Sequence, residues 1–204
     1  MAEERIFIPV ENFNIEGLIN EVPGDEAVVI THPHPLYGGE MNNNVVLSII
    51  NAYHQQGYTT LRINFRGVGQ SGGSYADGIG EQEDVRAAIS YLSDLGKTAI
   101  DLAGYSFGAR VNAMGLNSYE LVDRLVMVSP PVGFMDFSFL GYNSKIRLVI
   151  SGENDDIAPP AKIKELIPSW NPEAEFRVID GTNHFYSGGT TEVEEIIKDF
   201  LDKK

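Results

Sequence analysis

Cysteine is absent from this chain of 204 residues, and basic residues are scarce. Without cysteine there is no disulfide, no thiol nucleophile and no zinc site built on thiolates. The 15 Lys and Arg against 29 Asp and Glu leave a formal net charge of −14, which repels nucleic acid and anionic membranes. A membrane-length apolar run is also missing, and the charged N-terminus is unlike a signal peptide. We therefore expect a cytoplasmic protein with neither nucleic acid nor membrane as a partner.

Linker-like segments and internal repeats are missing as well. The 10 prolines and 21 glycines are scattered along the chain, and about 200 residues suit one hydrophobic core. The sequence predicts a single domain over residues 1–204.

The chain alternates strand and helix patterns. An antiparallel pair of strands is expected at residues 5–9 and 14–22. Six apolar runs then have the character of strands buried on both faces: 27–30, 60–65, 99–103, 124–128, 146–150 and 175–179. Apolar residues recur at helical spacing in 44–56, 81–95, 109–117, 161–166 and 191–201. This order predicts an α/β fold: a mostly parallel sheet with helices on both faces and the antiparallel N-terminal hairpin at one edge.

The segment Gly104-Tyr105-Ser106-Phe107-Gly108 lies between an expected strand and an expected helix. This is the setting of a nucleophile elbow, where a tight turn holds a serine out above the sheet. A side chain at either flanking position would strike the neighbouring strand or helix, which accounts for the two glycines. We interpret Ser106 as a nucleophile; an N-capping serine at a strand-end turn is the alternative.

A serine nucleophile needs a neighbouring base, which a carboxylate orients. His184 follows the last expected strand and can reach the same rim as Ser106, whereas His54 falls within a helix among polar neighbours. Candidate acids follow the strand 146–150, at Glu153, Asp155 and Asp156. The chain order of serine, acid and histidine is typical of α/β hydrolases.

With these residues the chain resembles the α/β-hydrolase family from residue 27 to the C-terminal helix. It is similar in particular to small bacterial hydrolases with a His-Pro-His-Pro segment, here residues 32–35. The family pattern Gly-x-x-Asp-x-Ile/Val-x-Pro matches residues 152–159 and implies Asp155 as the acid, with Asp156 as an alternative. Asp136, after the strand 124–128, is another conceivable acid. The family's final Gly-x-x-His-Phe pattern falls on residues 181–185.

The resemblance also implies an oxyanion hole made of two backbone N–H groups. One belongs to Phe107, the residue after the nucleophile. The other belongs to His34 or Leu36, because the two prolines of the segment have no N–H. The prolines also break the strand geometry that would put His32 and His34 on one face, so we expect these histidines to fix the loop and bind no metal.

Residues 67–72 form a literal G-x-G-x-x-G after the strand 60–65. A dinucleotide site would need a helix to begin at the third glycine. A further glycine-rich stretch follows instead, and the next element is a helix, so we expect a structural loop.

Residues 129–144 form a short connection between the expected strands 124–128 and 146–150. Larger lipases of this fold insert a lid at this place, so we expect an open site without a lid. The apolar residues of this stretch line an acyl pocket, form a homodimer surface or cover the core. They are Phe134, Met135, Phe137, Phe139, Leu140 and Tyr142. The substrate pocket is predicted to contain Tyr37, Tyr105, Phe134, Phe137 and Phe185.

The sequence thus predicts a serine hydrolase that cleaves small-molecule carboxylic esters through an acyl-enzyme and needs no cofactor. A thioesterase or a peptidase with the same three residues stays open. So does a binding module that keeps the fold without catalysis.

Overall fold

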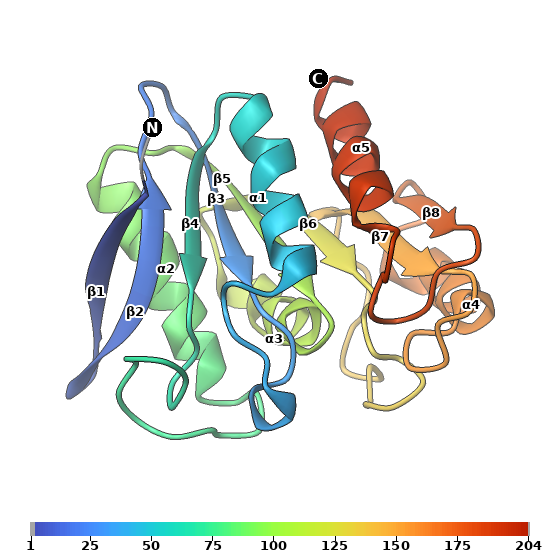
Figure 1. The fold of residues 1–204 in the computed structure, drawn as a ribbon, viewed down its shortest axis with the longest axis horizontal. Coiled ribbons are helices and arrows are strands. Elements are labelled where there is room, and N and C mark those ends of the chain that lie inside the picture. The colour runs from blue at the N-terminus through green and yellow to red at the C-terminus, as the bar shows by residue number, and fades with distance from the viewer. Residues whose placement is uncertain (1–2, 204) are drawn as a thin grey trace.

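A computed structural model describes residues 3–203 and has one eight-stranded sheet at its centre. The strand order is β1-β2-β4-β3-β5-β6-β7-β8 (Figure 1). The strands are β1 Glu4–Val10, β2 Phe13–Asn20, β3 Glu26–Thr31, β4 Thr59–Ile63, β5 Ala99–Tyr105, β6 Val122–Val128, β7 Ile146–Gly152 and β8 Glu175–Ile179. The pairs β1–β2 and β2–β4 are antiparallel, and all other neighbouring pairs are parallel. The predicted fold class and its N-terminal edge hairpin are confirmed.

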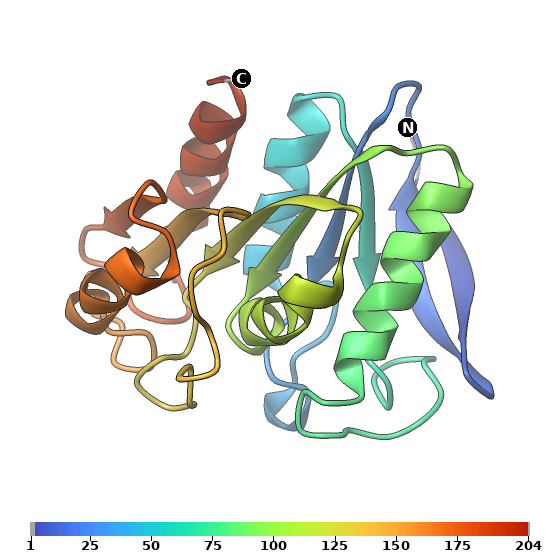
Figure 2. The same ribbon diagram turned by 180° about the vertical axis from the view of Figure 1, so that it is seen from behind.

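Helices cover both faces of the sheet. They are α1 Asn44–Gln55, α2 Glu81–Asp94, α3 Phe107–Gly115, α4 Pro160–Trp170 and α5 Thr190–Leu201. Helices α1 and α5 lie side by side on one face (Figure 1), and α2, α3 and α4 lie on the other (Figure 2). No helix within residues 3–203 is both long and apolar enough to cross a membrane.

Strand β3 shows why the central strands are apolar throughout. Ala27 and Val29 belong to the core on the side of α2 and α3, whereas Val28 and Ile30 belong to the core under α1 and α5. Successive side chains of a strand point to opposite faces. A strand covered by helices on both sides therefore needs apolar residues at every position.

Two elements differ from the sequence prediction. Strand β8 was expected to be buried on both faces, but it is the edge strand, and Arg177 and Val178 are exposed. Helix α4 was expected to end at residue 166, yet it continues through Pro168 to Trp170. Trp170 is fully buried, with its ring 5.6 Å from that of Phe137. This long-range packing stabilises a last turn that local sequence disfavours.

The topology brings several loops together along the edge of the sheet that is formed by the C-terminal ends of its parallel strands. Because β3, β5, β6, β7 and β8 run parallel, their C-terminal ends share that edge (Figure 1). Ligands of open α/β sheets bind outside this edge. The residues after these strands therefore make up the candidate site.

Candidate active site

Ser106 lies in the sharp turn between β5 and α3. Its φ of 55° and ψ of −116° are a backbone conformation that residues other than glycine rarely adopt. A Cβ atom on Gly104 would lie 2.6 Å from the backbone nitrogen of Ala109, and one on Gly108 would lie 2.7 Å from the carbonyl carbon of Thr31. Both distances are too short for real atoms, so the close approach expected from the two glycines is present.

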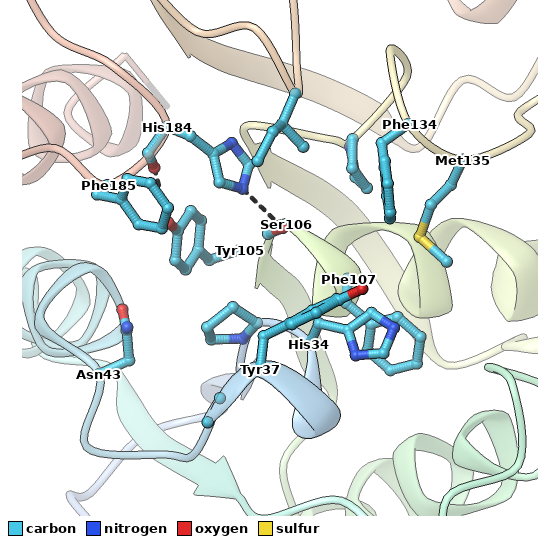
Figure 3. Close-up of a pocket in the computed structure, with 15 residues that line it drawn as sticks. His34, Tyr37, Asn43, Tyr105, Ser106, Phe107, Phe134, Met135, His184 and Phe185 are labelled. Carbon is cyan, nitrogen blue, oxygen red and sulfur yellow. Dashed lines mark hydrogen bonds between the residues drawn. The ribbon is translucent and has the colours of Figure 1, made fainter.

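Ser106, His184 and Asp155 form a continuous hydrogen-bonded chain. Ser106 Oγ lies 2.9 Å from His184 Nε2 (Figure 3). His184 Nδ1 lies 2.9 Å and 3.0 Å from the two carboxylate oxygens of Asp155. A carboxylate only accepts hydrogen bonds, so Nδ1 carries the imidazole proton and Nε2 is free to accept from the serine hydroxyl. The structure brings together the three residues predicted to be catalytic; their roles stay predictions.

The other candidate acids lie elsewhere. Asp156 is exposed. Asp136 accepts hydrogen bonds from the backbone N–H and the hydroxyl of Ser138, which lower the pKa of this carboxyl group. Neither carboxylate has a hydrogen bond to His184. Among the carboxylates considered, the geometry favours Asp155 as the residue that orients the imidazole.

Asp155 is buried but well supplied with donors. Its Oδ1 accepts from the backbone N–H groups of Ile157 and Ala158 at 2.9 Å and 2.7 Å, and its Oδ2 accepts from Ser129 Oγ at 2.7 Å. Burial raises the pKa of Asp155, but the hydrogen bonds and charge of His184 and the donors Ala158 and Ser129 outweigh it, so the pKa is lowered. The group is therefore held as a carboxylate.

Two tyrosines stabilise the histidine and the acid through hydrogen bonds, one of them by way of a serine. Tyr105 OH donates to the backbone carbonyl of His184 at 2.6 Å. Ser129 gives its one proton to Asp155, so Tyr186 OH, 2.7 Å away, donates to Ser129 Oγ. The sequence reasoning missed Ser129 and Tyr186. Ser129 directly follows β6, and Tyr186 lies two residues after His184. These positions were the available signals.

The two oxyanion-hole alternatives differ in their surroundings. Phe107 is the first residue of α3, so its N–H has no partner within the helix. The N–H of Leu36 already donates to Nδ1 of the His34 ring at 3.3 Å. His34 itself lines the cavity beside Ser106. This favours His34 over Leu36 as the second donor, together with Phe107.

His32 is fixed in the interior of the same loop. Its Nε2 accepts from the backbone N–H of Phe65 at 3.1 Å, and its Nδ1 donates to the carbonyl of Pro33 at 2.7 Å. Burial lowers the pKa of His32 to about 4, so the ring is neutral near pH 7. Both nitrogens are used by the backbone, which gives His32 the structural role that was expected for it. Within residues 3–203 no group of three or more His, Asp or Glu residues has a metal-binding arrangement.

The G-x-G-x-x-G residues 67–72 belong to a loop between β4 and α2. Helix α2 begins only at Glu81, so no helix starts at the third glycine. Arg66 fixes this loop through hydrogen bonds from its backbone N–H and its guanidinium to Asp84 of α2. The loop is structural, as the sequence predicted.

A cavity of about 540 Å³ opens beside Ser106. Tyr37, Tyr105, Phe134 and Phe185 line it, as predicted (Figure 3). The remaining lining residues are Pro33, His34, Gly38, Gly39, Asn43, Ser106, Phe107, Pro131, Met135, Ile157 and His184. Asn43, Pro131 and Ile157 were not expected there.

Phe137 is the incorrect member of the predicted pocket. Its side chain is only 5% exposed and packs against the rings of Trp170 and Phe139, each at 5.6 Å. The reason is that the loop between β6 and β7 turns this residue toward the core. Of the six aromatic and aliphatic residues that the sequence suggested for an acyl pocket in that loop, Phe134 and Met135 reach the cavity.

Comparison with known proteins gives this geometry a family. No family model matches the sequence. A protein of Rickettsia prowazekii (strain Madrid E), described as "Uncharacterized protein RP471", is 34% identical over a match of 189 residues that covers 88% of this chain and 79% of the relative. An α/β serine hydrolase homologue of known structure from Coxiella burnetii is 33% identical, with a TM-score of 0.88 over 98% of this chain and 97% of that one. The chain belongs to the α/β-hydrolase superfamily.

This α/β hydrolase is also similar to XC6422 from Xanthomonas campestris, described as a serine hydrolase without a lid. The two chains are 26% identical, with a TM-score of 0.89 over 100% of this chain and 95% of the other. Residues 129–145 of the present α/β hydrolase contain turns and no helix.

Proposed function

We propose that this α/β hydrolase is a serine esterase that cleaves small carboxylic esters through an acyl-enzyme on Ser106. The observation that carries the proposal is the hydrogen-bonded chain from Ser106 Oγ through His184 to Asp155. The serine lies in a strained backbone turn, and both Ser106 and His184 line a cavity of substrate size.

The geometry supports a two-step acyl transfer. Ser106 Oγ attacks the ester carbonyl carbon as its proton passes to His184 Nε2. The C–O bond to the alcohol then breaks, and His184 returns the proton to the leaving oxygen. Water repeats the sequence on the acyl-enzyme, which releases the acid and restores the serine hydroxyl. Asp155 remains a carboxylate throughout and stabilises the imidazolium.

Charge on the carbonyl oxygen would be stabilised by the backbone N–H groups of Phe107 and His34. These donors are part of rigid elements, the first turn of α3 and the loop that His32 anchors. They need no rearrangement when the oxyanion forms.

A protonated His184 has no lone pair at Nε2 and cannot accept the serine proton. Acylation through this base therefore requires the neutral imidazole.

The test combines turnover and covalent labelling. The parent should hydrolyse p-nitrophenyl acetate and react with a fluorophosphonate probe. Ser106→Ala should lose at least about three orders of magnitude in kcat and all labelling. Ser90→Ala, an equivalent change at an exposed position of α2, should keep both. Labelling that persists in Ser106→Ala would move the nucleophile to another residue, and an inactive, unlabelled parent would favour a binding module.

A further inference from the structure

The direction in which a substrate must lie follows from the positions of the reacting groups, if Ser106 is the nucleophile. The leaving oxygen has to lie beside His184 Nε2, which returns the proton to it. The oxyanion points to the backbone N–H groups of Phe107 and His34. The acyl group is then directed away from His184, toward Phe134 and Met135. Figure 3 shows these two side chains on the side of Ser106 opposite to Phe185.

The walls of the cavity carry no charged side chain. Its 15 lining residues include no Asp, Glu, Lys or Arg, and seven of them carry aromatic rings. The ring-bearing residues are His34, Tyr37, Tyr105, Phe107, Phe134, His184 and Phe185. A charged group entering such a cavity loses its hydration and finds no partner of opposite charge. An aromatic ring buries apolar area there and gains from ring–ring contacts.

Three aromatic side chains around the cavity are left open to water. Tyr37 is 77% exposed, Phe134 is 65% exposed and Phe185 is 63% exposed. They come from three different loops, after β3, β6 and β8, and they lie around one cavity. Large apolar side chains gathered in this way mark a binding site.

Charges of both signs lie near the acyl side, where Arg110 donates to the backbone carbonyl of Asp136, the residue after Met135. Burial lowers the pKa of His34, and the negative charges of Glu81 and Asp77 oppose that shift. The whole chain adds a formal net charge of −14. This net charge would repel a carboxylate on the substrate as it approaches the protein.

From the arrangement of these walls we propose that the enzyme selects uncharged esters whose acyl group carries an aromatic ring. The ring lies between Phe134 and Met135 on one side and Phe107 and His34 on the other. This selection rests on the proposed esterase function and adds the class of substrate to it.

The test uses p-nitrophenyl esters, so that the leaving group is constant, with each rate divided by the rate of hydroxide hydrolysis. The hexanoate and the mono-adipate differ in a terminal carboxylate, and the adipate should have a kcat/KM at least about 100-fold lower. The hydrocinnamate carries a phenyl ring in place of the terminal propyl group of the hexanoate, and the hydrocinnamate should be favoured by about tenfold.

Variants of Phe134 test whether this side chain causes the preference for uncharged, aromatic acyl groups. Phe134→Leu keeps apolar bulk but removes the ring, so it should lower the ratio of hydrocinnamate to hexanoate kcat/KM by about fivefold to tenfold. Phe134→Lys should raise the relative rate of the adipate by providing a cation. Tyr142→Ala is the matched control: this side chain is 68% exposed on the same loop but does not line the cavity. It should leave every ratio unchanged.

The possible results separate the two proposals. Equal rates for hexanoate and adipate, or a hexanoate preferred over hydrocinnamate, would overturn the substrate class. The esterase proposal would survive either result as long as Ser106→Ala abolishes hydrolysis of p-nitrophenyl acetate. If the parent hydrolyses none of the esters, the esterase proposal itself fails. The same ratios in Phe134→Leu and in the parent would remove Phe134 from the acyl site.

Discussion

Ser129 Oγ donates a hydrogen bond of 2.7 Å to Asp155 Oδ2, one of the two oxygens that face His184. Tyr186 OH donates in turn to Ser129 Oγ. Ser129 and Tyr186 are fully buried, and their φ angles of 46° and 52° lie in the left-handed region. Such conformations cost free energy and persist only where the surrounding structure enforces them. The pair therefore holds the carboxylate in one orientation toward the imidazole.

We predict that Ser129→Ala lowers kcat for p-nitrophenyl acetate by about tenfold and leaves KM nearly unchanged. A hydrogen bond to a buried carboxylate contributes roughly 1.5–3 kcal/mol, and its loss lets Asp155 turn away from His184. Tyr186→Phe should have a smaller effect, because Ser129 can still donate. Melting temperatures of both variants separate lost positioning from lost folding. A change confined to KM would argue against a positioning role.

Substitutions of the three aspartates should differ sharply in effect. Asp155→Asn keeps the shape of the side chain but stabilises the wrong imidazole tautomer, which costs about four orders of magnitude in kcat in the worked serine triad. Asp156→Asn and Asp136→Asn should change kcat less than about tenfold, since their charges are screened by water. Steady-state kinetics on the folded variants measures which substitution lowers kcat. A collapse in Asp156→Asn or Asp136→Asn would transfer the orienting role to that residue.

The strain at Ser106 predicts a difference between two inactive variants. Ser106→Ala keeps a Cβ at a φ of 55°, whereas glycine adopts this conformation without strain. The relief of roughly 1–3 kcal/mol exceeds the extra entropy that glycine has in the unfolded chain. Ser106→Gly should therefore unfold at a higher urea concentration than Ser106→Ala. If Ser106→Gly proves the less stable of the two, the elbow is not strained.

His32 should make the protein less stable at acid pH. The folded state holds the pKa of His32 at about 4, below the ordinary value of 6.5. Between these values the unfolded chain binds a proton that the folded chain does not, so the free energy of unfolding falls as pH drops through 6.5 toward 4. The loss should reach roughly 2 kcal/mol at about pH 5.

The matched variant for this prediction is His32→Gln, whose amide oxygen can accept from the Phe65 N–H but does not titrate. It should be less stable than the parent near neutral pH, and the difference should shrink as the pH is lowered. Urea unfolding at several pH values measures both curves. Parallel curves would mean that His32 does not contribute to the acid sensitivity.

The layered fold and the serine turn could be predicted from sequence because both depend on short-range patterns. Continuous apolar runs and helical spacing define which faces are buried, whatever the details of the loops. Gly104 and Gly108 allow a close approach between adjoining segments, so the turn at Ser106 is encoded within five residues. Chain order then predicted which loops share an edge of the sheet, since parallel strands place their C-terminal ends together.

Only the tertiary structure decided what depends on the direction of single side chains. Asp155 and Asp156 are neighbours in one loop, and contacts with Ser129 and His184 determine which of them faces inward. Phe137 packs on Trp170 whereas Phe134 reaches the cavity. These orientations depend on partners distant in the chain, which a local pattern does not specify. The sequence alone therefore determined the kind of site, and long-range packing determined which side chains complete it.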